Sequence, residues 1–128
     1  MRRAAGYALG AVLLGALSAA AGELFPALRG TQGQGFWFVC LLGPLLEETV
    51  FRGIAYAAVK ALFGEKAAVV VCAVLFALAH GSWPRMLAAL PAGLFFGWIR
   101  KKEGGIAQPA AAHMAVNILI WIWNALRG

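Results

Sequence analysis

The chain has 128 residues, of which 62% are hydrophobic and 12% are charged, about half of the charged fraction that is typical of soluble domains. This composition allows one domain and excludes an ordinary water-soluble enzyme, because the apolar residues come in long blocks typical of membrane spans. The net charge of +6 does not indicate nucleic-acid binding, because the basic residues cluster at the ends of these blocks.

The first apolar block covers residues 4–22 and follows two arginines. We expect residues 1–22 to form a first transmembrane helix or signal-anchor, although the small residues at its end also fit a cleaved signal peptide. The second block covers residues 36–63, which at ~1.5 Å per residue is longer than a ~30 Å hydrocarbon core requires. We therefore expect it to tilt, kink or protrude, with Pro44 as the kink site.

Three further blocks complete the chain. Residues 64–66 predict a tight turn, after which the third block ends near His80. The fourth block covers residues 86–99 and contains Pro91, and the fifth covers about residues 106–126. Together the blocks predict an all-α, polytopic membrane helix bundle with about five transmembrane helices around a buried polar cavity.

The distribution of basic residues predicts the orientation of this bundle. With five spans and a cytoplasmic N-terminus, more basic residues face the cytoplasm (Arg2, Arg3, Lys60, Lys66, Arg100, Lys101, Lys102) than face outward (Arg29, Arg85, Arg127). The Ala- and Arg-rich composition indicates a GC-rich bacterial coding sequence. We therefore expect a multi-pass protein of a bacterial inner (plasma) membrane with a cytoplasmic N-terminus.

Ionisable residues inside the apolar blocks are few, and each is a functional candidate. Glu48 and Arg52 are four residues apart and share a helix face, which predicts a buried, structural ion pair. Glu47 points about 100° away from Glu48, between Gly43 and Phe51, and has no local counter-ion. We expect Glu47 to face the cavity, where an unpaired buried carboxylate suits general acid–base chemistry.

Two histidines occur in the same four-residue spacing with a partner. Phe76 and His80 share a face of the third block, and His113 and Asn117 share a face of the fifth. Either pair can serve ring packing or an interhelical hydrogen bond alone. With the glutamates, however, these residues form a set that can activate water and stabilise an oxyanion.

Three motifs in this order resemble the signatures of the CPBP family of intramembrane proteases. The family includes type II CAAX prenyl endopeptidases and bacteriocin-processing, Abi-like proteins. The motifs are EETVFR (residues 47–52), FALAH (76–80) and HMAVN (113–117). The resemblance covers about residues 44–119 and implies that residues 36–126 form the catalytic membrane core. It departs from some members at Pro84, where they carry an asparagine.

The resemblance implies a glutamic-type intramembrane endopeptidase that hydrolyses a peptide bond in a membrane-associated peptide or protein, in C-terminal or leader processing. The site residues that it implies are Glu47, Glu48, His80, His113 and Asn117 as catalytic groups, with Arg52 and Phe76 in support. The first glutamate would act as general base, and the second would fix the helix together with the arginine. The histidines would position water and stabilise the oxyanion, to which the asparagine would donate a hydrogen bond.

The resemblance implies no nucleic-acid partner and no obligatory cofactor. The expected partners are the membrane-associated substrate and the lipid bilayer. A zinc ion stays open as an alternative, with Glu47, His80 and His113 as ligands. From the residues alone, a non-enzymatic membrane immunity or scaffold protein and a proton-coupled transport subunit also stay open.

A site that contains both histidines requires a particular conformation of the chain between the fourth and fifth blocks. Counted along ideal helices, His80 and His113 fall at different depths in the membrane. They converge only if residues 104–109 are partly non-helical and reach inward, which is tolerated where backbone lines a cavity.

Overall fold

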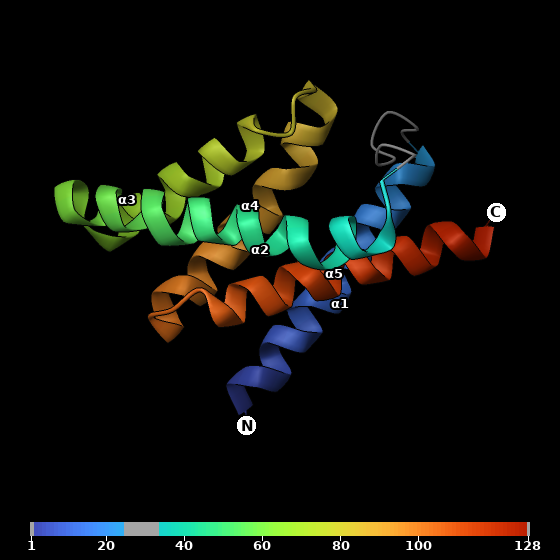
Figure 1. The fold of residues 1–128 in the computed structure, drawn as a ribbon, viewed down its shortest axis with the longest axis horizontal. Coiled ribbons are helices and arrows are strands. Elements are labelled where there is room, and N and C mark those ends of the chain that lie inside the picture. The colour runs from blue at the N-terminus through green and yellow to red at the C-terminus, as the bar shows by residue number, and fades with distance from the viewer. Residues whose placement is uncertain (1, 25–33, 128) are drawn as a thin grey trace.

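The structure is a computed structural model that describes residues 2–24 and 34–127. In chain order it forms α1 (Arg2–Leu24), η2 (Phe38–Leu42), α2 (Gly43–Glu48), η3 (Thr49–Ala55), α3 (Tyr56–Leu78), α4 (Trp83–Glu103) and α5 (Ala107–Arg127), as Figure 1 shows. The elements η2 and η3 are π-helical. The described part of the chain is almost entirely helical and contains no strand, which confirms the predicted all-α membrane bundle.

The elements from η2 to α3 form one long helical hairpin. Gly64 has a φ of 85°, in a region that glycine enters without a steric penalty, and the chain reverses there. Figure 1 shows the green ribbon running to one extremity of the molecule and returning. The limbs 38–63 and 65–78 pack together through Tyr56, Ala68 and Cys72. The predicted turn at residues 64–66 is thereby confirmed, and the five apolar blocks correspond to five helical limbs.

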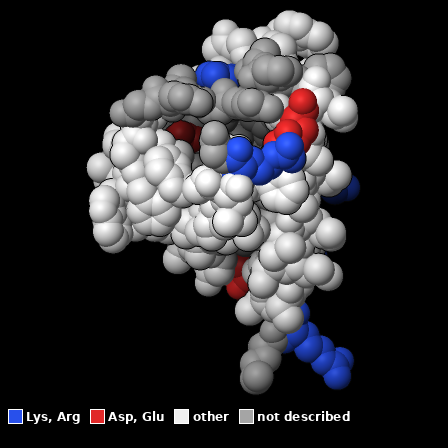
Figure 2. Space-filling view, turned by 90° about the vertical axis from the view of Figure 1, so that its right-hand side faces the viewer, with Lys and Arg blue, Asp and Glu red and all other residues white. Residues whose placement is uncertain are grey.

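The exterior of the bundle is apolar. The helix α1, the helical stretch Phe38–Leu78 and α5 are each long and apolar enough to cross a membrane. Large apolar side chains such as Leu17, Ile54 and Leu62 are exposed along these helices. Figure 2 shows that charged side chains are few on the face it presents. Exposed apolar surface of this extent is typical of a protein whose solvent is lipid.

The tip of the hairpin extends beyond the turn between α4 and α5. Near that turn, Nε of Arg100 donates a hydrogen bond to the carbonyl oxygen of Arg52 at 2.9 Å. Ile106 lies beside Gly53, since a Cβ atom on Gly53 would be 3.9 Å from its Cγ2 atom. Gly53 precedes Gly64 by about three helical turns, or ~16 Å. The hairpin therefore protrudes beyond the rest of the bundle.

The segment between α4 and α5 is partly non-helical, as predicted. Residues 104–106 are non-helical, and Gly104 ends α4 with a φ of 74°. Residues 107–109 are helical, and Pro109 lies in the first turn of α5, where proline is tolerated. The rings of His80 and His113 nevertheless approach each other, because both contact the ring of Phe76.

Small residues allow the helices to approach closely. The buried residues of α1 recur every three or four positions and are Ala11, Gly15, Ala19 and Gly22. A Cβ atom on Gly15 would lie 3.0 Å from Cβ of Leu119 in α5. Between α3 and α4, a Cβ atom on Gly93 would lie 3.1 Å from the backbone of Ala73. This close packing supplies van der Waals contact where lipid removes the hydrophobic drive between helices.

Candidate active site

The short helix α2 places the two adjacent glutamates in different surroundings. Glu48 is 0% exposed and faces the bundle, whereas the side chain of Glu47 is 42% exposed. The prediction that Glu47 is the buried carboxylate is therefore wrong. One face of α2 and η3 is buried at Pro44, Glu48 and Arg52. Glu47 lies about 100° around the helix from that face. It is thus at the edge of the bundle.

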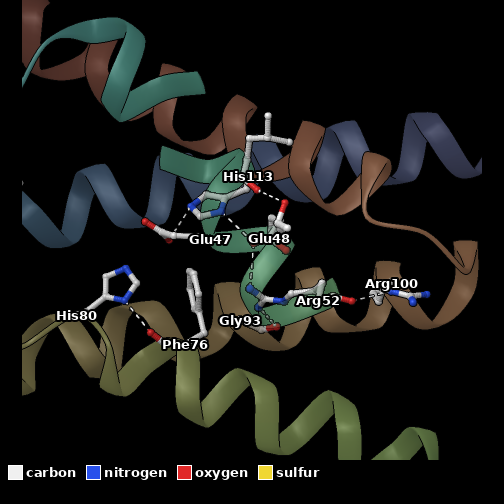
Figure 3. A network of polar contacts seen from close by, with 10 residues as sticks. Glu47, Glu48, Arg52, Phe76, His80, Gly93, Arg100 and His113 are labelled. Atoms are coloured by element: carbon white, nitrogen blue, oxygen red, sulfur yellow. Dashed lines mark hydrogen bonds and ion pairs between the residues drawn. The ribbon is translucent and has the colours of Figure 1, made fainter. Parts of the chain in front are cut away.

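Glu48 is the centre of a buried polar network, drawn in Figure 3. Nη1 of Arg52 donates to Oε1 of Glu48 at 2.9 Å, which confirms the predicted ion pair. Nδ1 of His113 lies 2.9 Å from the same oxygen. Because a carboxylate paired with arginine can only accept, Nδ1 of His113 carries a proton and donates it, and Nε2 is left with a lone pair.

Arg52 is held by further contacts that the sequence did not reveal. Its Nη2 atom donates to the carbonyl oxygen of Gly93 at 2.8 Å. Its guanidinium carbon lies 4.5 Å from the ring centroid of Phe76 and 5.5 Å from that of Phe96. Hydrogen bonds, a counter-ion and aromatic faces together offset the cost of burying this charge.

The imidazole of His80 is oriented in the same way as that of His113. Nδ1 of His80 lies 2.8 Å from the carbonyl oxygen of Phe76, so it donates there and leaves Nε2 as an acceptor. Nε2 of His113 is 3.9 Å from Oε2 of Glu47. In Figure 3 the Glu47 carboxylate points toward the remaining ring nitrogen of His80. Three acceptor groups therefore face one region at the edge of the bundle.

Phe76 brings the two histidines together. Its ring centroid lies 4.8 Å from that of His80 and 5.5 Å from that of His113. The two imidazoles cannot be further apart than the sum of these distances, which is below the ~12 Å beyond which a shared general-base site is ruled out. The two histidines are therefore close enough to belong to one site. The ring of His113 is also stacked on that of Phe96, with 4.8 Å between the ring centroids.

Asn117 has a partner that the motif alone did not predict. Its Nδ2 atom donates to the carbonyl oxygen of Val39 at 2.8 Å. In the π-helical stretch η2, the amide of Gly43 bonds the carbonyl of Phe38. The next residue, Pro44, has no N–H group to offer Val39. Asn117 replaces that missing donor. The second N–H of the Asn117 amide could make the contact with the oxyanion, which stays a prediction.

Arg100 and Tyr56 are further residues of the network that sequence reasoning missed. Arg100 was assigned to membrane-flanking charge, yet its guanidinium carbon lies 4.8 Å from the ring centroid of Tyr56. Tyr56 is fully buried one turn after Arg52. A tyrosine at four-residue spacing after a buried arginine was the one signal in the sequence that pointed to it.

The chemistry of the site is that of hydrogen-bond acceptors. Glu47, His80 and His113 offer a carboxylate and two Nε2 lone pairs, which can accept from water or ligate zinc. Their Nδ1 protons are held by a carbonyl and a carboxylate, as in many zinc sites. Among the described residues, however, no group of three or more His, Cys, Asp or Glu side chains is close enough to hold a metal.

The comparison with protein families agrees with the motifs. A family model described as type II CAAX prenyl endopeptidase Rce1-like matches residues 31–119, a range that contains all three motifs. No curated protein and no solved structure matches the chain. The family match covers more than half of the chain, includes both glutamates and both histidines of the site, and confirms the predicted resemblance. The chain belongs to the Rce1-like family of type II CAAX prenyl endopeptidases.

Proposed function

We propose that this multi-pass membrane protein is a glutamic-type intramembrane endopeptidase, in which Glu47 activates the water that hydrolyses a peptide bond. Membership of a family of membrane proteases supports the reaction class. The observation that carries the catalytic type is the position of Glu47: a half-exposed carboxylate 3.9 Å from Nε2 of His113, with the imidazole of His80 beside them.

In the proposed reaction, one water molecule binds between Glu47 and the histidines. It donates one hydrogen to the Glu47 carboxylate and the other to an Nε2 lone pair, so its oxygen is free to attack the scissile carbonyl carbon. Glu47 takes the proton as the tetrahedral intermediate forms and returns it to the leaving amine. General-base catalysis of this kind contributes about 10²- to 10⁴-fold in rate.

The buried network prepares His113 for this reaction. Glu48 fixes the ring with Nδ1 protonated, and its negative charge stabilises the imidazolium that forms if Nε2 takes a proton. Neutral His80 and His113 both present Nε2 lone pairs, so a histidine can donate to the developing oxyanion only after its Nε2 is protonated. The second N–H of Asn117 is the remaining candidate donor.

The proposed substrate is a membrane-anchored peptide or protein that is cut near its C-terminus or after a leader. The apolar exterior around Glu47, with Leu46 and Val50 both about half exposed, favours a substrate that arrives from within the bilayer. The proposed orientation places the N-terminus in the cytoplasm. Arg3 lies 3.8 Å from Glu103, next to the basic run Arg100–Lys102, so these charges gather at one end.

The Glu47→Gln variant tests this function. It removes the base and almost keeps the shape, so cleavage of membrane proteins should fall at least ~100-fold. The readout is the set of processed termini in membranes with and without the chain, determined by mass spectrometry. Glu65→Gln is the matched control, because Glu65 pairs with Lys60 at the exposed hairpin tip. Processing that survives Glu47→Gln would refute the proposal, and loss of cleavage on chelation alone would point to zinc.

A further inference from the structure

A row of buried polar atoms leads away from the site. Glu48, Arg52 and Tyr56 lie at successive four-residue intervals and are 0%, 0% and 1% exposed. Each has a side-chain atom without a hydrogen-bond partner among the described residues: Oε2 of Glu48, Nε of Arg52 and the hydroxyl of Tyr56. Three such atoms on consecutive turns of one helical limb are unusual, because buried polar groups are almost always bonded.

Shared contacts show that these residues form one cluster. Glu48 and Arg52 are joined by their 2.9 Å hydrogen bond. Arg100 joins Arg52 to Tyr56, since its Nε atom bonds the Arg52 carbonyl while its guanidinium lies over the Tyr56 ring. Arg100 itself is half-buried and lies in the last turn of α4, at the basic end of the bundle. The row therefore runs from His113 and Glu48 to that end.

The unpartnered atoms call for a ligand that both donates and accepts. Leaving a polar group unpaired in an apolar interior costs about 1–3 kcal/mol per group. Oε2 of Glu48 requires a donor, Nε of Arg52 requires an acceptor, and a tyrosine hydroxyl takes either. Water meets all three needs, and buried water typically makes about three hydrogen bonds to groups of this kind.

We propose that the Glu48–Arg52–Tyr56 row binds ordered water molecules, and that this internal water connects the site to the basic end of the bundle. This inference rests on the proposed function, because hydrolysis consumes one water molecule per peptide bond. The exposed side of Glu47 borders apolar residues that face lipid, so the water that hydrolysis consumes has to be resupplied from another side. Tyr56 is thus a positioning residue for water that reaches the site through Arg100.

Radical footprinting tests the water directly, without measuring activity. X-ray radiolysis of the protein in lipid nanodiscs produces hydroxyl radicals from water, including bound water. Tyr56 and the adjacent Cys72 should be oxidised although both are buried. Cys40 is the reference, because it is equally buried and lies outside the row. Labelling of Tyr56 and Cys72 no faster than that of Cys40 would show a dry row and overturn the proposal.

The kinetic test uses the two tyrosines of the chain. Tyr56→Phe removes the hydroxyl and should lower kcat about 2- to 10-fold, the range that one hydrogen bond contributes, with KM unchanged. Tyr7→Phe is the matched control, because the Tyr7 hydroxyl is bonded to Glu103 and is not one of the unpartnered atoms of the row, and its kcat should not change. A labelled Tyr56 with an unchanged kcat in Tyr56→Phe would refute the supply of water to the site.

The two proposals fail separately. A protein that loses cleavage in Glu47→Gln but shows no labelling of Tyr56 keeps its proposed function and lacks the water row. Strong labelling of Tyr56 combined with full cleavage by Glu47→Gln would overturn the glutamic mechanism, and with it the purpose of the water, although the water itself would be present.

Discussion

Two adjacent residues of identical chemistry have different surroundings in this protein. Glu48 is enclosed by Arg52 and His113, and its charge is neutralised there. Glu47 keeps a half-exposed carboxylate within 3.9 Å of the second nitrogen of the same imidazole. At the scale of single residues, one glutamate therefore holds the histidine, and the other is the group that we propose as the base.

Removing the buried negative charge should destabilise the fold strongly. Glu48→Gln leaves Arg52 as an uncompensated buried cation, so the free energy of unfolding should fall by about 3–5 kcal/mol. An SDS-unfolding titration in mixed micelles measures this loss. The double variant Glu48→Gln with Arg52→Gln should recover much of it, because no buried charge remains. If the double variant lost as much free energy of unfolding as the two single variants together, the assigned pairing would be contradicted.

At the scale of elements, two π-helical stretches flank α2, the short helix that carries both glutamates. A π-helical stretch is rare and often marks a functional site. Here η2 ends at Leu42, two residues before Pro44, and the carbonyl that this proline leaves without a donor is bonded by Asn117 from α5. The approach of the chain to the glutamates is thus fixed by a side chain that lies one turn after His113.

A double-mutant cycle between Asn117 and Pro44 tests this account. Asn117→Ala should lower the free energy of unfolding by about 1–3 kcal/mol, because the Val39 carbonyl loses its donor in an apolar interior. Pro44→Ala supplies a backbone N–H at the position where the carbonyl needs one. The second change should therefore cost less in the Asn117→Ala background than alone. Strictly additive losses in thermal unfolding would mean that Asn117 does not compensate for the proline.

At the scale of the whole molecule, α1 is packed into the bundle at both ends. Near its start the Tyr7 hydroxyl donates to Glu103 of α4, and near its end Nη2 of Arg127 in α5 is 3.0 Å from Oε2 of Glu23. Between these contacts the small residues of α1 lie against α5. The first helix therefore supports the helix that carries His113.

Enlarging a residue in this interface should show how much α1 contributes. Gly15→Leu places a side chain where a Cβ atom alone would already be 3.0 Å from Leu119, so it should cost about 1–3 kcal/mol. Gly6→Leu is the control in the same helix, because nothing lies within 4 Å of its Cβ position. Melting temperatures in detergent measure both. Equal melting temperatures for the two variants would mean that α1 does not pack as described.

Local spacing predicted what lies within one or two helical turns and little beyond. The Glu48–Arg52 pair, the Phe76–His80 contact and the turn at Gly64 follow from four-residue intervals and from glycine chemistry. The contacts of Arg52 with Gly93 and of Asn117 with Val39 join distant segments, and no local interval encodes them. The exposure of Glu47 was assigned wrongly, because the absence of a local counter-ion says nothing about which side of a helix faces the bundle.

The ring of Phe76 touches both imidazoles, packs edge-on against Phe51 and Phe96, and lies under the guanidinium of Arg52. Two histidines separated by more than thirty positions in the chain thus pack against the same aromatic ring. A change of volume at this single position would therefore displace both imidazoles at once.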